Sequence, residues 1–330
     1  MANISERLLD EAVLHRIALS RYSTATVRKV LALLNRSDLS LVERILRADN
    51  EGRDPRRLEL LLQEIRALQA DAWTVVGARV NEDVNALAAV EKAFAGRLVD
   101  LGARATSYVT ASAPTTAQVI AAVNARPFQG RFLRDWLRDA EEGAAKRVRD
   151  TLRQGFIEGR SVSELVRQIR GSRALGYRDG VLEVSRRGAE AMVRTALTHT
   201  AAVAAKETYA AMGVEEATFL AVLDSRTTLT CASLNGQTFA LDKFPWPPRH
   251  INCRSTSMPV VMGMPKVEAP SYAEWLKRQP VEVQNDILGV RKAQLFRSSK
   301  LTLDRFTDRA GRVLTLTELK ERDQTAFAGL

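Results

Sequence analysis

The chain has 330 residues, of which 45% are hydrophobic and 27% are charged, and its formal net charge is +10 at pH 7. This length exceeds what one hydrophobic core usually organises, so the sequence predicts two or more domains. Only two cysteines occur, which excludes a disulfide-built scaffold and fits a reducing compartment. Neither a secretory signal nor an apolar run of about 18 residues is present, so we expect a protein made in a cytoplasm, with no membrane segment.

Residues 1–110 are predicted to form an N-terminal helical region. Short helices are expected at 5–20 and 24–35, and Ser40 with Glu43 has the pattern of a capping box ahead of another helix. Further along the chain, the spacing between successive apolar residues alternates between four and three positions. They are Leu61, Ile65, Leu68, Ala72 and Val75, continued by Val84, Leu87, Val90, Phe94 and Leu98. This spacing predicts one long helix or a helix pair of coiled-coil character, and a helix in an ordinary bundle fits equally well.

Residues 111–213 are predicted to form a basic helical region. Lys and Arg exceed Asp and Glu by 7 over residues 101–210, against 0 over residues 1–100 and 3 over residues 211–330. Helices are expected after the capping patterns at Thr115 and Ser161, along an apolar stripe from Leu133 to Phe156, and from about 179 to 212.

Within this region, basic side chains recur at helical spacing. The candidates for phosphate contacts are Arg134, Arg138, Lys146, Arg149 and Arg153. Such a stripe could follow the backbone of DNA in a salt-dependent contact. Acidic residues are interleaved with it, namely Asp135, Asp139, Glu141, Glu142 and Asp150. A solvated helix face with ion pairs between residues four apart is therefore the competing interpretation.

Residues 214–262 are predicted to form a small β module. Phe219 to Leu223 is a short apolar run typical of a strand, and Asn235-Gly236 is a tight-turn signal, so a hairpin or small meander is expected. Pro245, Pro247 and Pro248 indicate an extended connection, and the residues after Cys253 indicate a final strand.

The β module contains the most chemically crowded stretch of the chain, from Asp224 to Ser255. The extended loop is predicted to bring His250 and Cys253 back toward Cys231. Imidazole and thiolate are ligands that Zn²⁺ prefers, and Asp224 is the candidate for a fourth ligand, so zinc is the candidate cofactor. Two alternatives stay open: a disulfide between the cysteines, or two reduced, buried thiols with His250 bound to a backbone carbonyl.

Residues 263–330 are predicted to form a C-terminal helical skirt around the sheet. Capping patterns at Ser271 and Thr315, and a helix from about 281 to 288, mark its expected elements. The fold class expected for the whole chain is α+β and predominantly α-helical, with an extended N-terminal helical region followed by a small β-hairpin or sheet module that helices flank.

The crowded stretch resembles the phage Mu protein F-like minor head proteins, a family of phage head morphogenesis proteins. Its pattern joins Asp-x-Arg-Thr, Cys-x-x-Cys, Leu-x-Gly and Pro-Pro-x-His-x-Asn-Cys-Arg. Here the pieces are Asp224, Arg226, Thr227, Cys231, Leu234, Gly236, Pro247, Pro248, His250, Asn252, Cys253 and Arg254. Thr228 replaces the first cysteine of the pair, which removes one candidate zinc ligand. With Arg194-Thr195 upstream and residues to Gly289 downstream, the resemblance covers roughly residues 180 to 320.

Within this resemblance, arginines take structural roles. Arg194 and Thr195 lie where the family has an Arg-Thr pair, which implies an anchor; Arg194 beside Asp224 or a backbone carbonyl would lock its helix to the hairpin. Arg226 and Arg254 are interpreted as forks that bind a carboxylate or loop carbonyls.

The resemblance implies a virion structural protein without catalytic residues. Expected partners are the portal protein, the major capsid protein or the scaffolding protein, with several copies in the capsid interior or at the portal vertex, and sequence-independent contact with packaged or ejected DNA. Two alternatives remain. One is a small nuclease with His250 as acid or base and Arg226 or Arg254 holding phosphate; the other is a zinc-dependent nucleic-acid adaptor.

Overall fold

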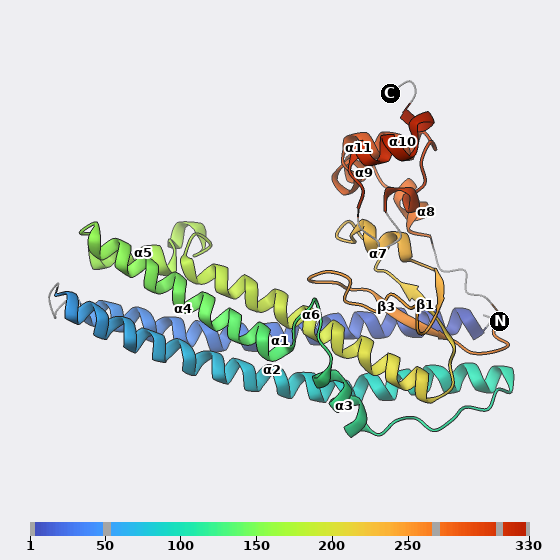
Figure 1. The fold of residues 1–330 in the computed structure, drawn as a ribbon, viewed down its shortest axis with the longest axis horizontal. Coiled ribbons are helices and arrows are strands. Elements are labelled where there is room, and N and C mark those ends of the chain that lie inside the picture. Colours follow the sequence, from blue (N-terminus) through green and yellow to red (C-terminus); the bar gives the residue numbers. More distant parts are fainter. Residues whose placement is uncertain (1–3, 49–53, 266–270, 308–312, 328–330) are drawn as a thin grey trace. The chain divides into compact units, whose positions relative to one another are not determined.

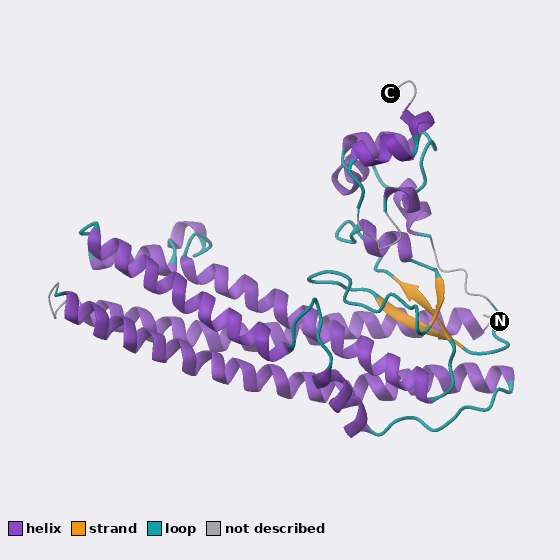
Figure 2. Cartoon of the chain, in the orientation of Figure 1, coloured by secondary structure: helices purple, strands orange, loops and turns teal. Residues whose placement is uncertain are grey.

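The structure, a computed structural model, describes residues 4–48, 54–265, 271–307 and 313–327. Most of these residues are helical, and three short strands form one sheet (Figure 2). The predicted α+β, predominantly helical fold class is thereby confirmed.

Two long helices form most of the N-terminal region, α1 (Ile4–Ala48) and α2 (Pro55–Thr106) (Figure 1). Of the two alternatives predicted along the apolar stripe, one long helix or a helix pair, the structure has the single long helix α2. The two short helices and the capping box at Ser40 were wrong, because α1 runs through all of them and the Ser40 hydroxyl donates to the Arg36 carbonyl within the helix. No glycine or proline interrupts the segment, and buried apolar residues continue along one face. These are Val27, Val30, Leu34, Leu41 and Ile45.

Residue contacts divide the chain into two compact units, each built from separate segments. The first unit comprises residues 1–19, 88–123 and 198–330, and the second comprises residues 20–87 and 124–197. Each unit contains parts of several of the four consecutive regions expected from the sequence. The division into those four regions therefore stays a prediction.

The second unit is helical. It includes α4 (Leu133–Ile157), α5 (Val162–Arg170), a short 3-10 turn (Arg173–Leu175) and the beginning of α6 (Val181–Ala211). Its main core joins residues of α1, α2, α4, α5 and α6. The fully buried members include Leu41, Ile45, Ile65, Val148, Leu152 and Ile169. The predicted capping box at Ser161 begins α5, with hydrogen bonds in both directions between Ser161 and Glu164.

The first unit contains the sheet, in the strand order β2-β1-β3, with both pairings antiparallel. The strands are β1 (Glu216–Leu220), β2 (Thr238–Ala240) and β3 (Thr256–Val260). The expected hairpin or small meander is corrected in one respect, because a short helix, α7 (Leu229–Leu234), lies between β1 and β2. Gly236 still makes a turn with φ of 79°, and its N–H donates to the Phe219 carbonyl at 2.8 Å.

Helices cover this sheet with apolar side chains. Ala95, Val99 and Ala103 of α2 share a core with Tyr209 of α6 and Phe219 of β1, and both cysteines belong to the same core. The helix α3 (Thr116–Ala125) begins at the predicted Thr115 and Gln118 pair, whose side chains and backbone N–H groups bond reciprocally.

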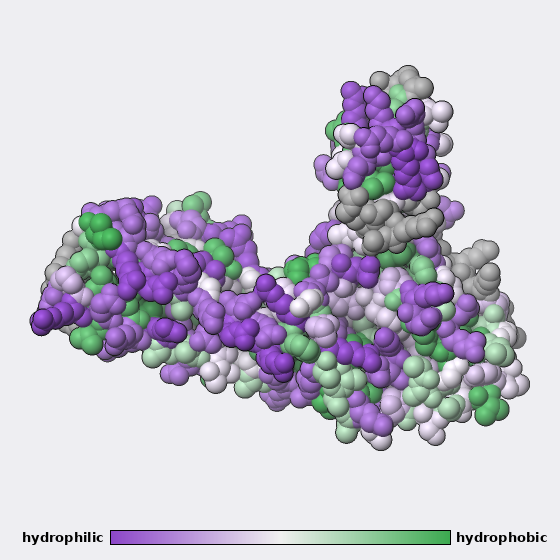
Figure 3. Space-filling model, in the orientation of Figure 1, coloured by the Kyte–Doolittle hydropathy of each residue, from purple (hydrophilic) through white to green (hydrophobic). Residues whose placement is uncertain are grey.

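Short helices follow the sheet and pack into a core with α7. They are α8 (Tyr272–Lys277), α9 (Val281–Leu288), α10 (Val290–Arg297) and α11 (Leu316–Arg322), with 3-10 turns at Leu303–Phe306 and Gln324–Phe327. The capping box predicted at Thr315 and Glu318 is present. Hydrophilic residues dominate the face of these helices that Figure 3 shows.

Candidate functional site

Three elements converge on the two cysteines in the first unit. Thr228 caps α7 through its hydroxyl, which accepts from the Cys231 N–H at 3.4 Å, and this places Cys231 on the buried side of the helix. The proline-containing loop then returns to Cys253, just before β3. Asn252, in the left-handed region with φ of 61°, makes the last bend. The Thr198 hydroxyl of α6 donates to the Cys253 carbonyl at 2.8 Å and holds the end of this loop.

Cys231, His250 and Cys253 form a compact cluster, as the loop was predicted to bring them together. The Cys231 Sγ lies 3.3 Å from the His250 Nε2 and 3.7 Å from the Cys253 Sγ, and the three ligand atoms all lie within 4.8 Å of one another. Nδ1 of His250 donates to the Ile251 carbonyl at 2.8 Å, which leaves Nε2 facing the sulfurs. Both cysteines are free thiols and buried.

The thiols of this cluster influence each other strongly. A hydrogen bond from Cys231, together with those from His250 and the backbone N–H groups of Ser255 and Arg249, lowers the pKa of Cys253 against the effect of burial. The interaction with Cys253 and burial raise the pKa of Cys231, so the two thiols are shifted in opposite directions. The hydrogen bond with Cys253 also raises the pKa of His250.

A buried arginine lies near this cluster. Arg16 of α1 is 9% exposed, and burial lowers its pKa to about 10, while the charges of Cys253 and Glu91 partly offset that effect. Sequence reasoning missed both Arg16 and Thr198. No local pattern could have revealed them, because they come from helices far from the loop in sequence.

Asp224 does not join the cysteine cluster. Its carboxylate accepts two hydrogen bonds from the guanidinium of Arg254, each of 2.5 Å, in the fork arrangement predicted for that arginine. Oδ1 also accepts the Arg226 N–H at 2.9 Å, and the Tyr272 hydroxyl donates to the Asp224 carbonyl. The carboxylate that was expected to be the fourth zinc ligand is therefore engaged in closing the loop.

The remaining motif residues lie apart from the cluster or at its edges. Arg194 binds the Glu190 carboxylate at 2.9 Å and the Thr24 hydroxyl at 3.4 Å rather than Asp224. The hydroxyl of Thr195, fully buried, donates to the Ala191 carbonyl one turn earlier. The Arg226 side chain is 79% exposed and lies 3.8 Å from Asp224. Pro248 follows Pro247 through a cis peptide bond in the loop that leads to His250.

The basic stripe lies on α4 in the second unit, where neighbouring groups engage its cations. Arg138 pairs with Asp135 at 3.2 Å, Lys146 with Asp150 at 2.6 Å, Arg149 with Asp150 at 3.3 Å and Arg153 with Glu59 at 2.9 Å, while Arg134 lies over the Phe132 ring. These pairs favour the solvated helix face over a dedicated phosphate site.

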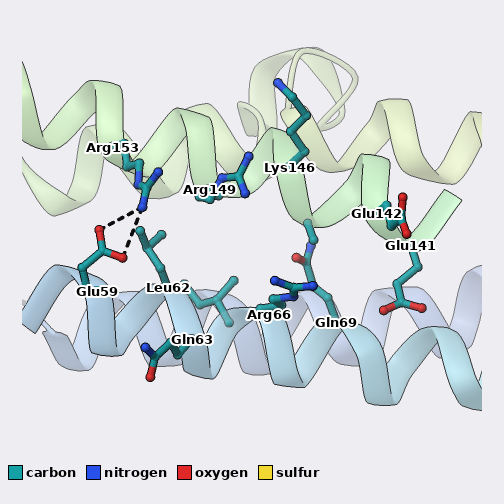
Figure 4. Close-up of a pocket in the computed structure, with 12 residues that line it drawn as sticks. Glu59, Leu62, Gln63, Arg66, Gln69, Glu141, Glu142, Lys146, Arg149 and Arg153 are labelled. Atoms are coloured by element: carbon teal, nitrogen blue, oxygen red, sulfur yellow. Dashed lines mark hydrogen bonds and ion pairs between the residues drawn. The ribbon is translucent and has the colours of Figure 1, made fainter. Parts of the chain in front are cut away.

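The same stripe lines a groove of about 400 Å³ between α2 and α4. Glu59 and Arg153 face each other across it, and Lys146 points away from α2 (Figure 4). Arg66 of α2, which sequence reasoning missed, also lines the groove and makes no ion pair with a described residue. Its participation depends on which face of α2 meets α4, and the helical period alone does not reveal that face.

Residues 146–258 match the family model of phage Mu protein F like protein. The resemblance expected over roughly residues 180 to 320 is thereby confirmed up to residue 258, and its part beyond that residue stays a prediction. We call residues 146–258 the Mu F-like region; it runs from α4 into β3 and contains the entire cysteine cluster with Asp224 and Arg254. The match points to bacteriophage head morphogenesis and, with it, to the virion. No curated protein and no solved structure matches the chain significantly. Among the described helices, none combines the length and the apolar character needed to span a membrane.

Proposed function

We propose that this chain is a minor head protein of a tailed bacteriophage that associates with the portal or the inner capsid during head assembly. The observation that carries the proposal is the family match over residues 146–258. The proposal places the protein in the virion, in the capsid interior or at the portal vertex, with several copies per particle. It also names the portal, capsid or scaffolding protein as the partner.

The architecture of the Mu F-like region supports a role in positioning. We call residues 224–255 the Cys/His knob. Its two ends are joined by the Asp224–Arg254 fork, and its base is held by the Thr198 and Tyr272 hydroxyls. These hydrogen bonds and the ion pair fix the loop at both ends. A surface that recognises a partner must keep its geometry, so such bonds suit that role.

Two exposed side chains of the knob are the part that we propose for partner contact. Arg226 projects into solvent with 79% of its side chain exposed, and Ile251, beside His250, is 39% exposed. A cationic and an apolar side chain on one rigid loop suit a partner surface with an acidic rim around an apolar contact.

The arrangement around His250 supports a protein without catalytic activity. A general base needs a free nitrogen within reach of substrate and a group that orients the ring. Here the Ile251 carbonyl orients the ring through Nδ1, but the free nitrogen, Nε2, faces the buried Cys231 sulfur rather than a substrate, and Asp224 is committed to Arg254. The nuclease alternative would require cleavage of DNA or RNA by the purified chain that a His250→Ala substitution abolishes.

DNA contact is a further part of the proposal, and we assign it to the groove between α2 and α4. Its carboxylates offset most of its cations, so binding should be weak and independent of sequence, and it should weaken further as salt rises. A nucleic-acid adaptor built on the Cys/His knob is less well supported, because no aromatic ring is exposed beside the cluster for base stacking within the described residues.

The test is complementation in a phage that carries the gene. Loss of the gene should sharply reduce infectious particles, and wild-type protein supplied in trans should restore them. Double substitution of Arg226→Glu and Ile251→Asp should fail to restore them although the protein folds, whereas Arg187→Glu, on an exposed face of α6, should complement normally. Normal particle yield after deletion, or purified particles that lack the protein, would refute the proposal.

A further inference from the structure

The cluster of Cys231, His250 and Cys253 has the dimensions of a metal site. Tetrahedral zinc with bonds of about 2.3 Å to sulfur and about 2.1 Å to nitrogen places two sulfurs about 3.8 Å apart, and a sulfur and a nitrogen about 3.6 Å apart. The observed separations are 3.7 Å between the two Sγ atoms and 3.3 Å between the Cys231 Sγ and the His250 Nε2. Two edges of a tetrahedral site are therefore nearly formed by the protein alone, and the third pair of ligand atoms, Cys253 Sγ and His250 Nε2, lies within 4.8 Å.

Hydrogen bonds from neighbouring groups orient the three candidate ligands, as they do around the ligands of known zinc sites. Nδ1 of His250 donates to a backbone carbonyl, so the nitrogen that faces the sulfurs is the one with the free lone pair. Backbone N–H groups of Ser255 and Arg249 donate to the Cys253 sulfur, an arrangement that suits a metal-bound thiolate. The three side chains thus need no rearrangement of the loop to bind an ion.

We propose that this chain binds one Zn²⁺ through Cys231, His250 and Cys253, with the fourth coordination position open to water. Asp224 does not fill that position, because its carboxylate is held by Arg254. Each thiol that is protonated before binding releases its proton to solvent, and no electrons are exchanged, since zinc is redox-inert.

Thr228 lies where a fourth ligand could be supplied. Its hydroxyl accepts from the Cys231 N–H and also hydrogen-bonds to the Cys231 sulfur, so its side chain borders the cluster. A thiol at position 228 would complete a set of three cysteines and one histidine, the closed coordination of structural zinc. An open position in the native chain predicts that the ion is lost more readily than from a closed site.

The experiment uses the full chain, purified without a chelator and without a polyhistidine tag. Elemental analysis should find about one zinc per chain, and mass spectrometry should show both thiols reduced. Cys253→Ser and His250→Ala should lose the zinc, whereas Asp224→Asn should retain it. Folded, reduced protein without zinc would overturn the proposal, and so would a mass two daltons lower that reductant restores, because that mass indicates a disulfide.

The open position is tested by competition with a chelator. Thr228→Cys should raise the chelator concentration needed to remove half of the zinc at least tenfold. Thr228→Ser, which keeps the cap, and Ser233→Cys, which adds a thiol on another side of α7, should behave like wild type. An unchanged chelator response in Thr228→Cys would refute the open position. All of these measurements use the isolated chain, so their outcome does not depend on whether the protein assembles phage heads.

Discussion

The fork between Asp224 and Arg254 should contribute measurably to the stability of the first unit. The two side chains are 33% and 24% exposed, between the surface and the buried limits. Surface pairs contribute about 0–1 kcal/mol, and breaking a buried pair costs about 3–5 kcal/mol. With two charge-assisted hydrogen bonds of 2.5 Å, we expect a coupling free energy of about 2 kcal/mol between the two residues.

A double-mutant cycle measures this coupling. Wild type, Asp224→Ala, Arg254→Ala and the double variant are unfolded in urea, with Trp246 and Trp275 of the first unit among the fluorescent reporters. Asp224→Asn is the matched control, because its remaining oxygen can still accept the Arg226 N–H; it should cost about 0.5–1 kcal/mol less than Asp224→Ala.

The coupling should also depend on pH. Burial opposes ionisation of Asp224, but the hydrogen bonds and charge of Arg254 outweigh it and lower the pKa of the carboxyl. A lowered folded-state pKa stabilises the protein above the unfolded value of about 3.9, and this contribution is lost as pH falls through the folded pKa. A coupling below about 0.5 kcal/mol at pH 7 would show that the fork does not hold the knob closed.

Three further outcomes are expected. Gly180→Ala should destabilise the second unit by about 2 kcal/mol or more, because the added Cβ would lie 2.3 Å from the Arg170 backbone. Gly188→Ala in α6 has open space around the added Cβ and should stabilise the unit by about 0.5–1 kcal/mol. Equal shifts in melting temperature for the two variants would contradict this reasoning. Ile169→Ala, at a fully buried position, should cost about 2–5 kcal/mol in urea unfolding, and a cost below 1 kcal/mol would disprove its core role. Arg66→Glu should weaken binding to double-stranded DNA at low salt and reduce the salt slope by about 1, while Arg187→Glu should not; identical binding curves would exclude the groove.

The elements that sequence predicted best are those whose signal is local. Ser161 and Thr315 begin helices as expected, because a capping box consists of neighbours in sequence. The same pattern at Ser40 failed because Leu41 and Ile45 continue the buried face of α1, and tertiary packing of that face outweighs a local capping preference. The short helix α7 was missed because strong turn signals at Asn235 and Gly236 favoured a hairpin or small meander in this segment.

The site was predictable only in its local part. The spacing of His250 and Cys253 and the proline-containing loop indicated a convergence on Cys231, which the structure has. The partner of Asp224 was not predictable, since arginine and metal compete for the same carboxylate, and only the distances show that Arg254 binds it. Metal binding itself stays a prediction.

The interleaving of the two units constrains how the chain folds as it is synthesised. Leu8 and Ala12 of α1 share a core with Leu220 and Met258, which the ribosome adds much later. The burial of the apolar side chains at the beginning of α1 therefore stays incomplete until the strands of the sheet have been synthesised. A nonsense mutation before β3 would leave these apolar side chains of α1 without Met258 as a packing partner. The truncated products should therefore aggregate or bind chaperones rather than persist as folded fragments.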